Sequence, residues 1–103
     1  MALQVFYLRQ AMSPRGRFTT LPPSVKEITL LAHFYVVAED EVNAGGAAGT
    51  FSLETGLECT EYICLPQALE RSQIADHDTE HIEAYELAQR DGFAIVLSLV
   101  SKW

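Results

Sequence analysis

The chain has 103 residues, of which 49% are apolar and 10% aromatic, and it carries 14 acidic against 7 basic side chains. This length fits a single domain over residues 1–103, and the composition is that of a globular protein, which argues against wholesale disorder. No apolar run reaches the roughly 18 residues of a membrane helix. The first 15 residues lack the continuous apolar segment of a signal peptide. We therefore expect a small, acidic, cytoplasmic protein.

The first part of the chain predicts two strands separated by a loop. Residues 2–9 are rich in β-branched and aromatic side chains, which favour a strand. Proline, glycine and serine residues predict a loop over 10–23. Residues 28–38 are ambiguous, because Ser24 and Glu27 fit a helix capping box whereas the segment itself is made of strand-forming residues. Its alternation of apolar and more polar residues favours a long strand.

The middle of the chain lacks a clear helical pattern. Three glycines lie within residues 45–49, and they predict a flexible loop over 39–50 with at most one helical turn. An extended segment is expected near 51–57. The alternating residues 58–65 then predict a further strand.

The last third of the chain predicts helices followed by a strand. Pro66 suits the first turn of a helix, where its missing N–H is not needed. Helical segments are expected over 67–75 and 80–90, and Asp91-Gly92 is a typical helix end. Residues 93–100 are almost entirely apolar, which is typical of a central strand covered on both faces.

These elements predict an α+β fold. We expect a two-layer sandwich in which an antiparallel or mixed sheet of four or five strands packs against one helical layer, formed by residues ~66–90.

The charge is unevenly distributed along the chain. Residues 1–26 have a net charge of +4, and residues 27–103 have a net charge of −11. Such an acidic body repels nucleic acid and anionic membranes, and it attracts partners with a basic surface. The simpler interpretation is that the charge only keeps the protein soluble.

Cys59 and Cys64 are five residues apart, a spacing that separates their side chains on either a strand or a helix. Without a secretion signal we expect two free thiols. The spacing is also a poor zinc signature, because no second cysteine pair is present.

Residues 76–81 form the one dense group of metal-ligand side chains. On a helix His77 and His81 would share a face, and His33 or Cys64 would have to supply a third zinc ligand. The favoured interpretation is that the acidic residues of this segment cap a helix and interact with its dipole. We therefore expect neither a metal nor a cofactor.

Arg15 and Arg17 flank Gly16 in the predicted first loop. Guanidinium groups beside a glycine suit an anion, although no phosphate-loop motif is present and a solvated loop is the simpler interpretation. No nucleophile motif is present either. An enzyme is therefore the alternative rather than the expected function, and it would use His33, His77 or His81 with one of these arginines.

The favoured function is a protein-binding module that occupies a basic, nucleic-acid-binding surface of its partner without itself binding nucleic acid or membrane. In size and charge alone, the chain resembles the phage-encoded inhibitors of host nucleases and CRISPR complexes, including anti-CRISPR proteins and DNA mimics. A structural subunit that forms a homodimer through an exposed sheet edge or through the apolar last strand is a further alternative. The side chains expected to contact the partner are Glu39, Asp40, Glu41, Asp76, Asp78, Glu80, Glu83, Arg15 and Arg17.

Overall fold

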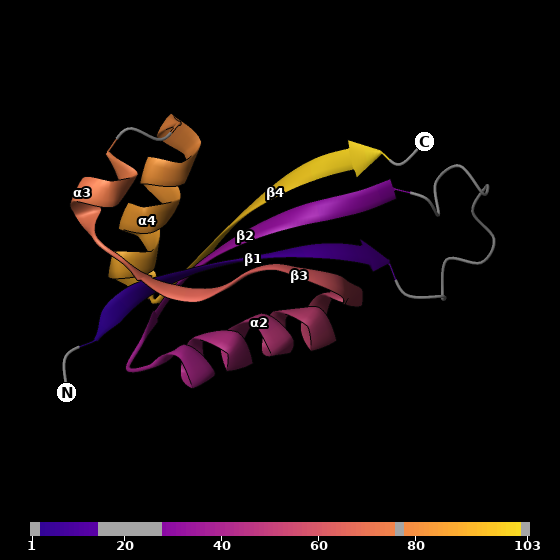
Figure 1. Cartoon of the computed structure of the whole chain (residues 1–103), viewed down its shortest axis with the longest axis horizontal. Coiled ribbons are helices and arrows are strands. Elements are labelled where there is room, and N and C mark those ends of the chain that lie inside the picture. The colour runs from indigo at the N-terminus through magenta and orange to yellow at the C-terminus, as the bar shows by residue number, and fades with distance from the viewer. Residues whose placement is uncertain (1–2, 15–27, 76–77, 102–103) are drawn as a thin grey trace.

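The protein is an α+β domain built on one antiparallel sheet (Figure 1). The computed structural model describes residues 3–14, 28–75 and 78–101. Its four strands have the order β3-β1-β2-β4. The elements are β1 (Gln4–Pro14), β2 (Ile28–Ala38), α2 (Glu41–Thr55), β3 (Leu57–Leu69), α3 (Arg71–Ile74), α4 (Thr79–Asp91) and β4 (Phe93–Ser101). The predicted α+β class and the predicted bounds of β2 are therefore confirmed.

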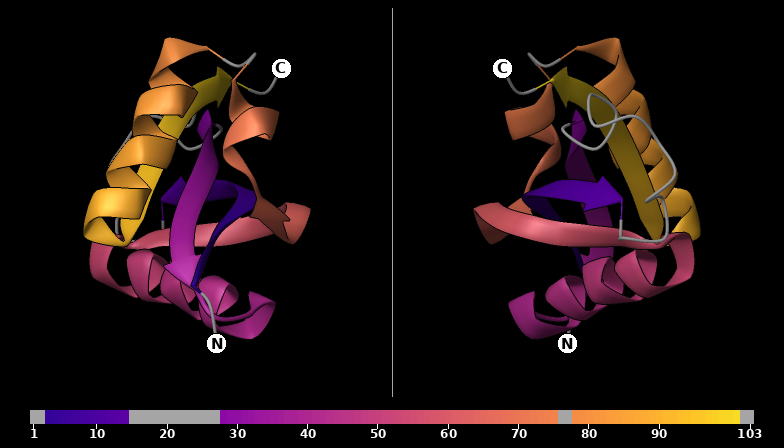
Figure 2. Two further views of the ribbon diagram at one scale, coloured as in Figure 1. Left: turned by 90° about the vertical axis from the view of Figure 1, so that its left-hand side faces the viewer. Right: turned by 90° about the vertical axis from the view of Figure 1, so that its right-hand side faces the viewer.

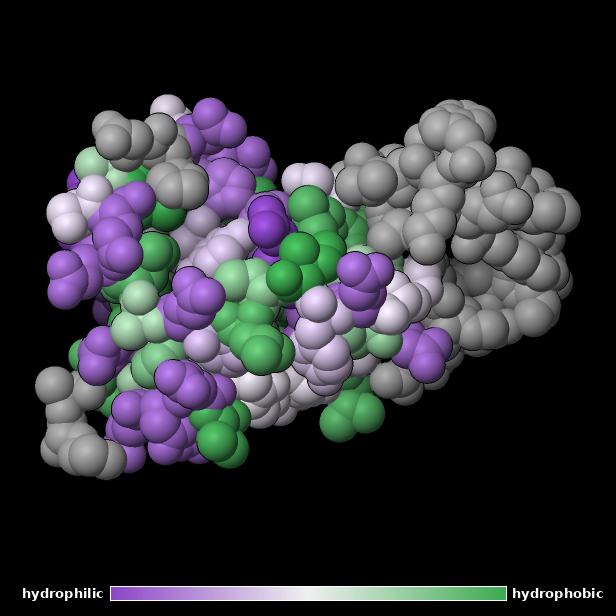
Figure 3. Space-filling model, viewed as in Figure 1, coloured by the Kyte–Doolittle hydropathy of each residue, from purple (hydrophilic) through white to green (hydrophobic). Residues whose placement is uncertain are grey.

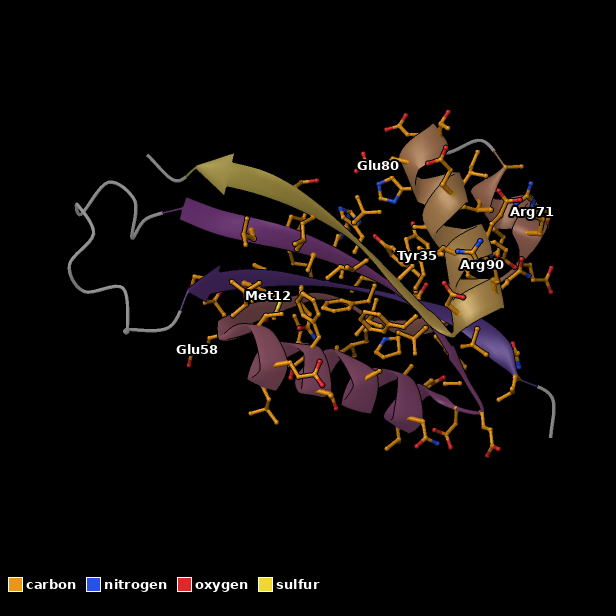
Figure 4. The ribbon with its side chains drawn as sticks, turned by 180° about the vertical axis from the view of Figure 1, so that it is seen from behind. Met12, Tyr35, Glu58, Arg71, Glu80 and Arg90 are labelled. Atoms are coloured by element: carbon orange, nitrogen blue, oxygen red, sulfur yellow. The ribbon has the colours of Figure 1, made fainter. Side chains whose placement is uncertain are left out.

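Helices cover both faces of the sheet rather than one (Figure 2). Helix α2 packs against one face, and helices α3 and α4 pack against the other. Figure 4 shows Met12 on the side of α2 and Tyr35 on the side of α4. Alternate residues of one strand therefore enter two separate apolar cores. One contains Phe6, Leu8, Met12, Phe34, Val36, Ala44 and Ala48, and the other contains Val5, Tyr35, Ile74, Ala84, Tyr85, Ala88 and Val96.

Helix α2 replaces the flexible loop predicted over 39–50 and the extended segment near 51–57, so both predictions are wrong. The side chain of Asp40 caps this helix by accepting a hydrogen bond from the backbone N–H of Asn43, at 2.9 Å. Ala44 and Ala48 are four residues apart and fully buried against the sheet. Burial of this face outweighs the poor helix propensity of the glycines, because most helical stability in proteins comes from packing.

Strand β3 continues through Pro66 to Leu69, so the helix predicted to start at Pro66 is wrong. Because β3 is an edge strand, one of its sides has no partner in the sheet, and a proline is tolerated there. The first helical segment is therefore reduced to Arg71–Ile74. Helix α4 confirms the second, and it ends as predicted at Gly92, whose φ of 91° is in the left-handed region that suits glycine.

Strand β4 lies at an edge of the sheet, which corrects its predicted central position. Its apolar composition has a different cause: Phe93 and Ile95 pack against the core beside α2, while Ala94 and Val96 are buried in the core beside α4. The central strands are β1 and β2, and β1 extends to Pro14, beyond the predicted start of the first loop at residue 10.

The state of the cysteines and the length of the helices were also predicted from the sequence. Cys59 and Cys64 are free thiols on β3, as predicted. Among the described residues, no helix is long and apolar enough to cross a membrane.

A charge placed on β4 tests this arrangement. Val96 is 5% exposed, and its neighbour Leu97 is 44% exposed. We expect Val96→Asp to lose its cooperative thermal transition in circular dichroism, because a buried unpaired charge costs several kcal/mol out of a typical total stability of about 5–15 kcal/mol. The matched variant Leu97→Asp should keep the transition. A Val96→Asp protein that melts like the wild type would contradict the burial of this strand beneath α4.

Candidate functional site

Two hydrogen-bonded tyrosine–histidine pairs lie between the sheet and the start of α4. The hydroxyl of Tyr7 is 2.8 Å from Nδ1 of His33, and the hydroxyl of Tyr35 is 2.6 Å from Nδ1 of His81. The tyrosine ring centroids are 5.3 Å apart, and the two imidazole centroids are 4.7 Å apart with the rings edge to face. The four rings therefore form one cluster that joins β1, β2 and α4.

The pairing of β1 with β2 positions this cluster. Tyr7 lies directly opposite Tyr35, and Arg9 lies directly opposite His33. Residues two apart on a strand share a face, so all four side chains lie on the side of α4. The bond from Tyr7 to His33 is thus a diagonal cross-strand contact. His81 reaches the cluster from the first turn of α4, where its backbone N–H donates to the carbonyl of Asp78.

The cluster forms one wall of a cavity of about 330 Å³. None of the described residues that line this cavity is acidic, although the chain has twice as many acidic as basic residues. The pocket is therefore a basic and aromatic region inside an acidic protein. Its lining consists of Tyr7, Arg9, His33, Tyr35, Leu69, Ile74 and His81, and we refer to it as the tyrosine–histidine pocket.

Arg9 contributes a polar atom without a partner. Its Nε is buried and makes no hydrogen bond. The ion pairs among the described residues are Arg71–Glu86 and Arg90–Asp91, so no described carboxylate neutralises Arg9. A buried donor left unpaired costs about 1–3 kcal/mol, and more when the group is charged. Such a group calls for an explanation, and a ligand that accepts its hydrogen bond provides one.

Burial sets the protonation states in the cluster. Together with smaller contributions from the neighbouring basic groups His81 and Arg9, it lowers the pKa of His33 to about 4. Burial also raises the pKa values of the Tyr35 and Tyr7 hydroxyls. At neutral pH His33 is therefore uncharged and the tyrosines keep their protons. In the hydrogen bond between the Tyr7 hydroxyl and Nδ1 of His33, the tautomer of the neutral imidazole decides which of the two groups donates.

The chemistry that this arrangement offers is mainly hydrogen-bond donation to a ligand. The guanidinium group of Arg9 donates, and the buried surroundings strengthen its interactions. No group of three or more His, Cys, Asp or Glu side chains that could hold a metal ion is found within residues 3–14, 28–75 and 78–101.

The acidic residues predicted to bind a partner lie on two separate elements. Glu39, Asp40 and Glu41 lie at the start of α2, whereas the other three described ones, Asp78, Glu80 and Glu83, lie at the start of α4. These helices pack on opposite faces of the sheet. Figure 3 accordingly shows one group of hydrophilic side chains over α3 and α4 and another over the start of α2. Arg15, Arg17, Asp76 and His77 lie outside the described residues.

The sequence provided no expectation for three of the polar site residues, namely Tyr7, Arg9 and Tyr35. It suggested roles for His33 and His81 only as zinc ligands or as members of an enzyme site with Arg15 or Arg17. The signal that was present is a pair of patterns, Tyr-x-Arg at 7–9 and His-x-Tyr at 33–35, each of which places two polar side chains on one strand face. Only the register of β1 against β2 shows that these faces coincide.

Comparison with known proteins adds no assignment to this geometry. No protein-family model matches the chain, and neither the curated proteins nor the solved structures searched contain a match. The function has to be argued from the pocket and from the surface.

Proposed function

We propose that this protein is a ligand-binding domain that holds a small anion in the tyrosine–histidine pocket. The observation that carries the proposal is the buried, unpartnered Nε of Arg9, a residue that lines a cavity whose described lining contains no acidic side chain. An anion would accept this hydrogen bond and balance the guanidinium charge. Charge-assisted bonds of this kind are about twice as strong as neutral ones.

The acidic exterior does not prevent such binding. The described carboxylates at the starts of α2 and α4 are exposed to solvent, where water and salt weaken the effect of their charges. Arg9 is partly buried and His33 is buried, so their interactions with a ligand are screened much less. The outer charge therefore lowers the association rate of an anion more than it lowers its affinity.

Titration with acetate and methanesulfonate at neutral pH tests the proposal, followed by the Nε–H signal of Arg9 and the ring signals of His33 in nuclear magnetic resonance spectra. We expect both anions to shift these signals, and uncharged acetamide to leave them unchanged. Arg9→Gln should weaken binding by roughly 10- to 100-fold, the loss typical of a hydrogen bond to a charged group. Arg90→Gln is the matched control, because Arg90 is an exposed arginine on α4 that pairs with Asp91.

The proposal fails if no anion shifts the Arg9 and His33 signals. It also fails if Arg9→Gln and Arg90→Gln weaken anion binding equally, because the effect would then be one of net charge rather than of the pocket.

As a second function, we propose that the outer face of α4 binds a partner with a basic surface, as an inhibitor of a nucleic-acid-binding protein would. Asp78, Glu80 and Glu83 are exposed and make no ion pair within the described part of the chain. Their charges are therefore available to a cationic partner. At the start of α2, in contrast, Asp40 is already engaged as a helix cap.

Charge reversal on α4 tests this second function. We expect proteins retained from a cell lysate at low salt to bind the wild type and to be lost, mainly through slower association, from the triple variant Asp78→Lys, Glu80→Lys, Glu83→Lys. The triple variant Glu54→Lys, Glu58→Lys, Glu61→Lys carries the same charge change on exposed positions elsewhere. Figure 4 shows how far Glu58 lies from Glu80. Equal retention by the α4 variant and the wild type would contradict a role for this face.

A further inference from the structure

The lining of the tyrosine–histidine pocket changes from charged to apolar along the strands. Arg9 and His33 are opposite each other at one level of the sheet, and Tyr7 and Tyr35 are opposite each other two residues further along. Leu69 of β3 pairs with β1 two residues beyond that. Four residues of a strand span about 13 Å. The pocket therefore has a basic end and an apolar end, separated by a distance that accommodates a ring-sized group.

The apolar end is formed by Leu69, Ile74 and the two tyrosine rings. Ile74 is 1% exposed and belongs to the core beneath α4, and Leu69 packs against the same core. A water molecule occupies about 30 Å³, so an inorganic ion would fill only a small part of the cavity of about 330 Å³. Filling the rest with an apolar group removes apolar surface from water, which favours binding.

Arg9 supplies the one charge at the basic end that does not depend on pH. Arg9 is the only arginine or lysine among the described residues of the lining, and His33 is uncharged at neutral pH because its pKa is lowered to about 4. One guanidinium balances one negative charge. A dianion would bring a second charge, and no second permanent cation of the described lining would offset the cost of its desolvation. The planar fork of the guanidinium also matches the two oxygens of a carboxylate.

We infer that the ligand is an amphipathic monocarboxylate, in which the carboxylate binds Arg9 and an apolar body of about one ring lies against Leu69, Ile74 and the tyrosine rings. This inference rests on the proposed function, namely that the pocket binds an anion. It adds the chemical class of the ligand and the direction in which the ligand lies.

Four probes separate the contributions of the two ends. Benzoate has both the charge and the ring, acetate has only the charge, benzamide has the ring without the charge, and inorganic phosphate, tested in mildly alkaline buffer, is mostly a dianion. We expect benzoate to bind about tenfold more tightly than acetate, since it buries additional apolar area. Benzamide and phosphate should bind at least several-fold more weakly than benzoate. Calorimetry and the Arg9 Nε–H signal report these affinities.

Leu69→Ala tests the direction of the ligand. This variant should weaken benzoate several-fold and leave acetate unchanged, because only the ring reaches Leu69. Leu65→Ala is the matched control on the same strand, where Leu65 is 66% exposed, and it should change neither affinity.

Each other outcome overturns a different statement. If acetate binds at Arg9 but benzoate binds no more tightly, or if phosphate binds best, the ligand class is wrong while anion binding stands. If Leu69→Ala weakens both ligands equally or neither, the direction is wrong. If benzamide binds as tightly as benzoate, or if no probe binds, the proposed anion-binding function is wrong as well.

Discussion

The register of β1 against β2 is the constraint on which the rest of the molecule depends. It places Tyr7 opposite Tyr35 and Arg9 opposite His33, and it leaves the intervening apolar residues to pack against α2. A slip of one residue would turn every side chain of β1 to the other face. Tyr7 and Arg9 would then enter the core beside α2, and that core would lose Phe6 and Leu8. The alternation of side chains along β1 and β2 therefore places apolar residues in the core beside α2 and the polar residues of the pocket on the opposite face.

Helix α4 supplies the fourth ring of the cluster. Its first turn brings His81 to the hydroxyl of Tyr35 and to the ring of His33. The hydroxyls of both tyrosines thus have partners, Tyr7 in His33 of β2 and Tyr35 in His81 of α4, as a buried polar network requires if it is not to destabilise the fold. The guanidinium of Arg9 is the exception within the described residues, because its Nε stays buried and unpaired. This unpaired Nε is the observation that supports the proposed anion site.

Local signals in the sequence predicted the elements that depend on local interactions. The alternation of residues 28–38 predicted β2, and the Asp91-Gly92 pair predicted the end of α4. The wrong predictions concern segments whose structure depends on packing or strand pairing between residues far apart in the sequence. Ala44 and Ala48 hold α2 against the sheet in spite of its glycines, and Pro66 remains in a strand because β3 has a free edge. Similarly, Tyr7 and His33 are 26 residues apart, and no property of either segment alone reveals that they meet. The acidic composition predicted a binding site on the surface of the protein. The pocket instead depends on a few basic and aromatic residues, and composition does not distinguish these from the other residues of the same type.

The titration of His33, followed by nuclear magnetic resonance of histidine-labelled protein, tests most directly whether the pocket is a buried basic site that binds an anion. In the free protein the pKa of His33 should lie near 4, below the ordinary value of about 6.5, because the ring is buried beside two other basic groups. Methanesulfonate keeps its charge throughout this pH range, so saturating the pocket with it should raise that pKa by placing a negative charge beside the ring. A His33 that titrates near its ordinary value and does not respond to the anion would contradict the account.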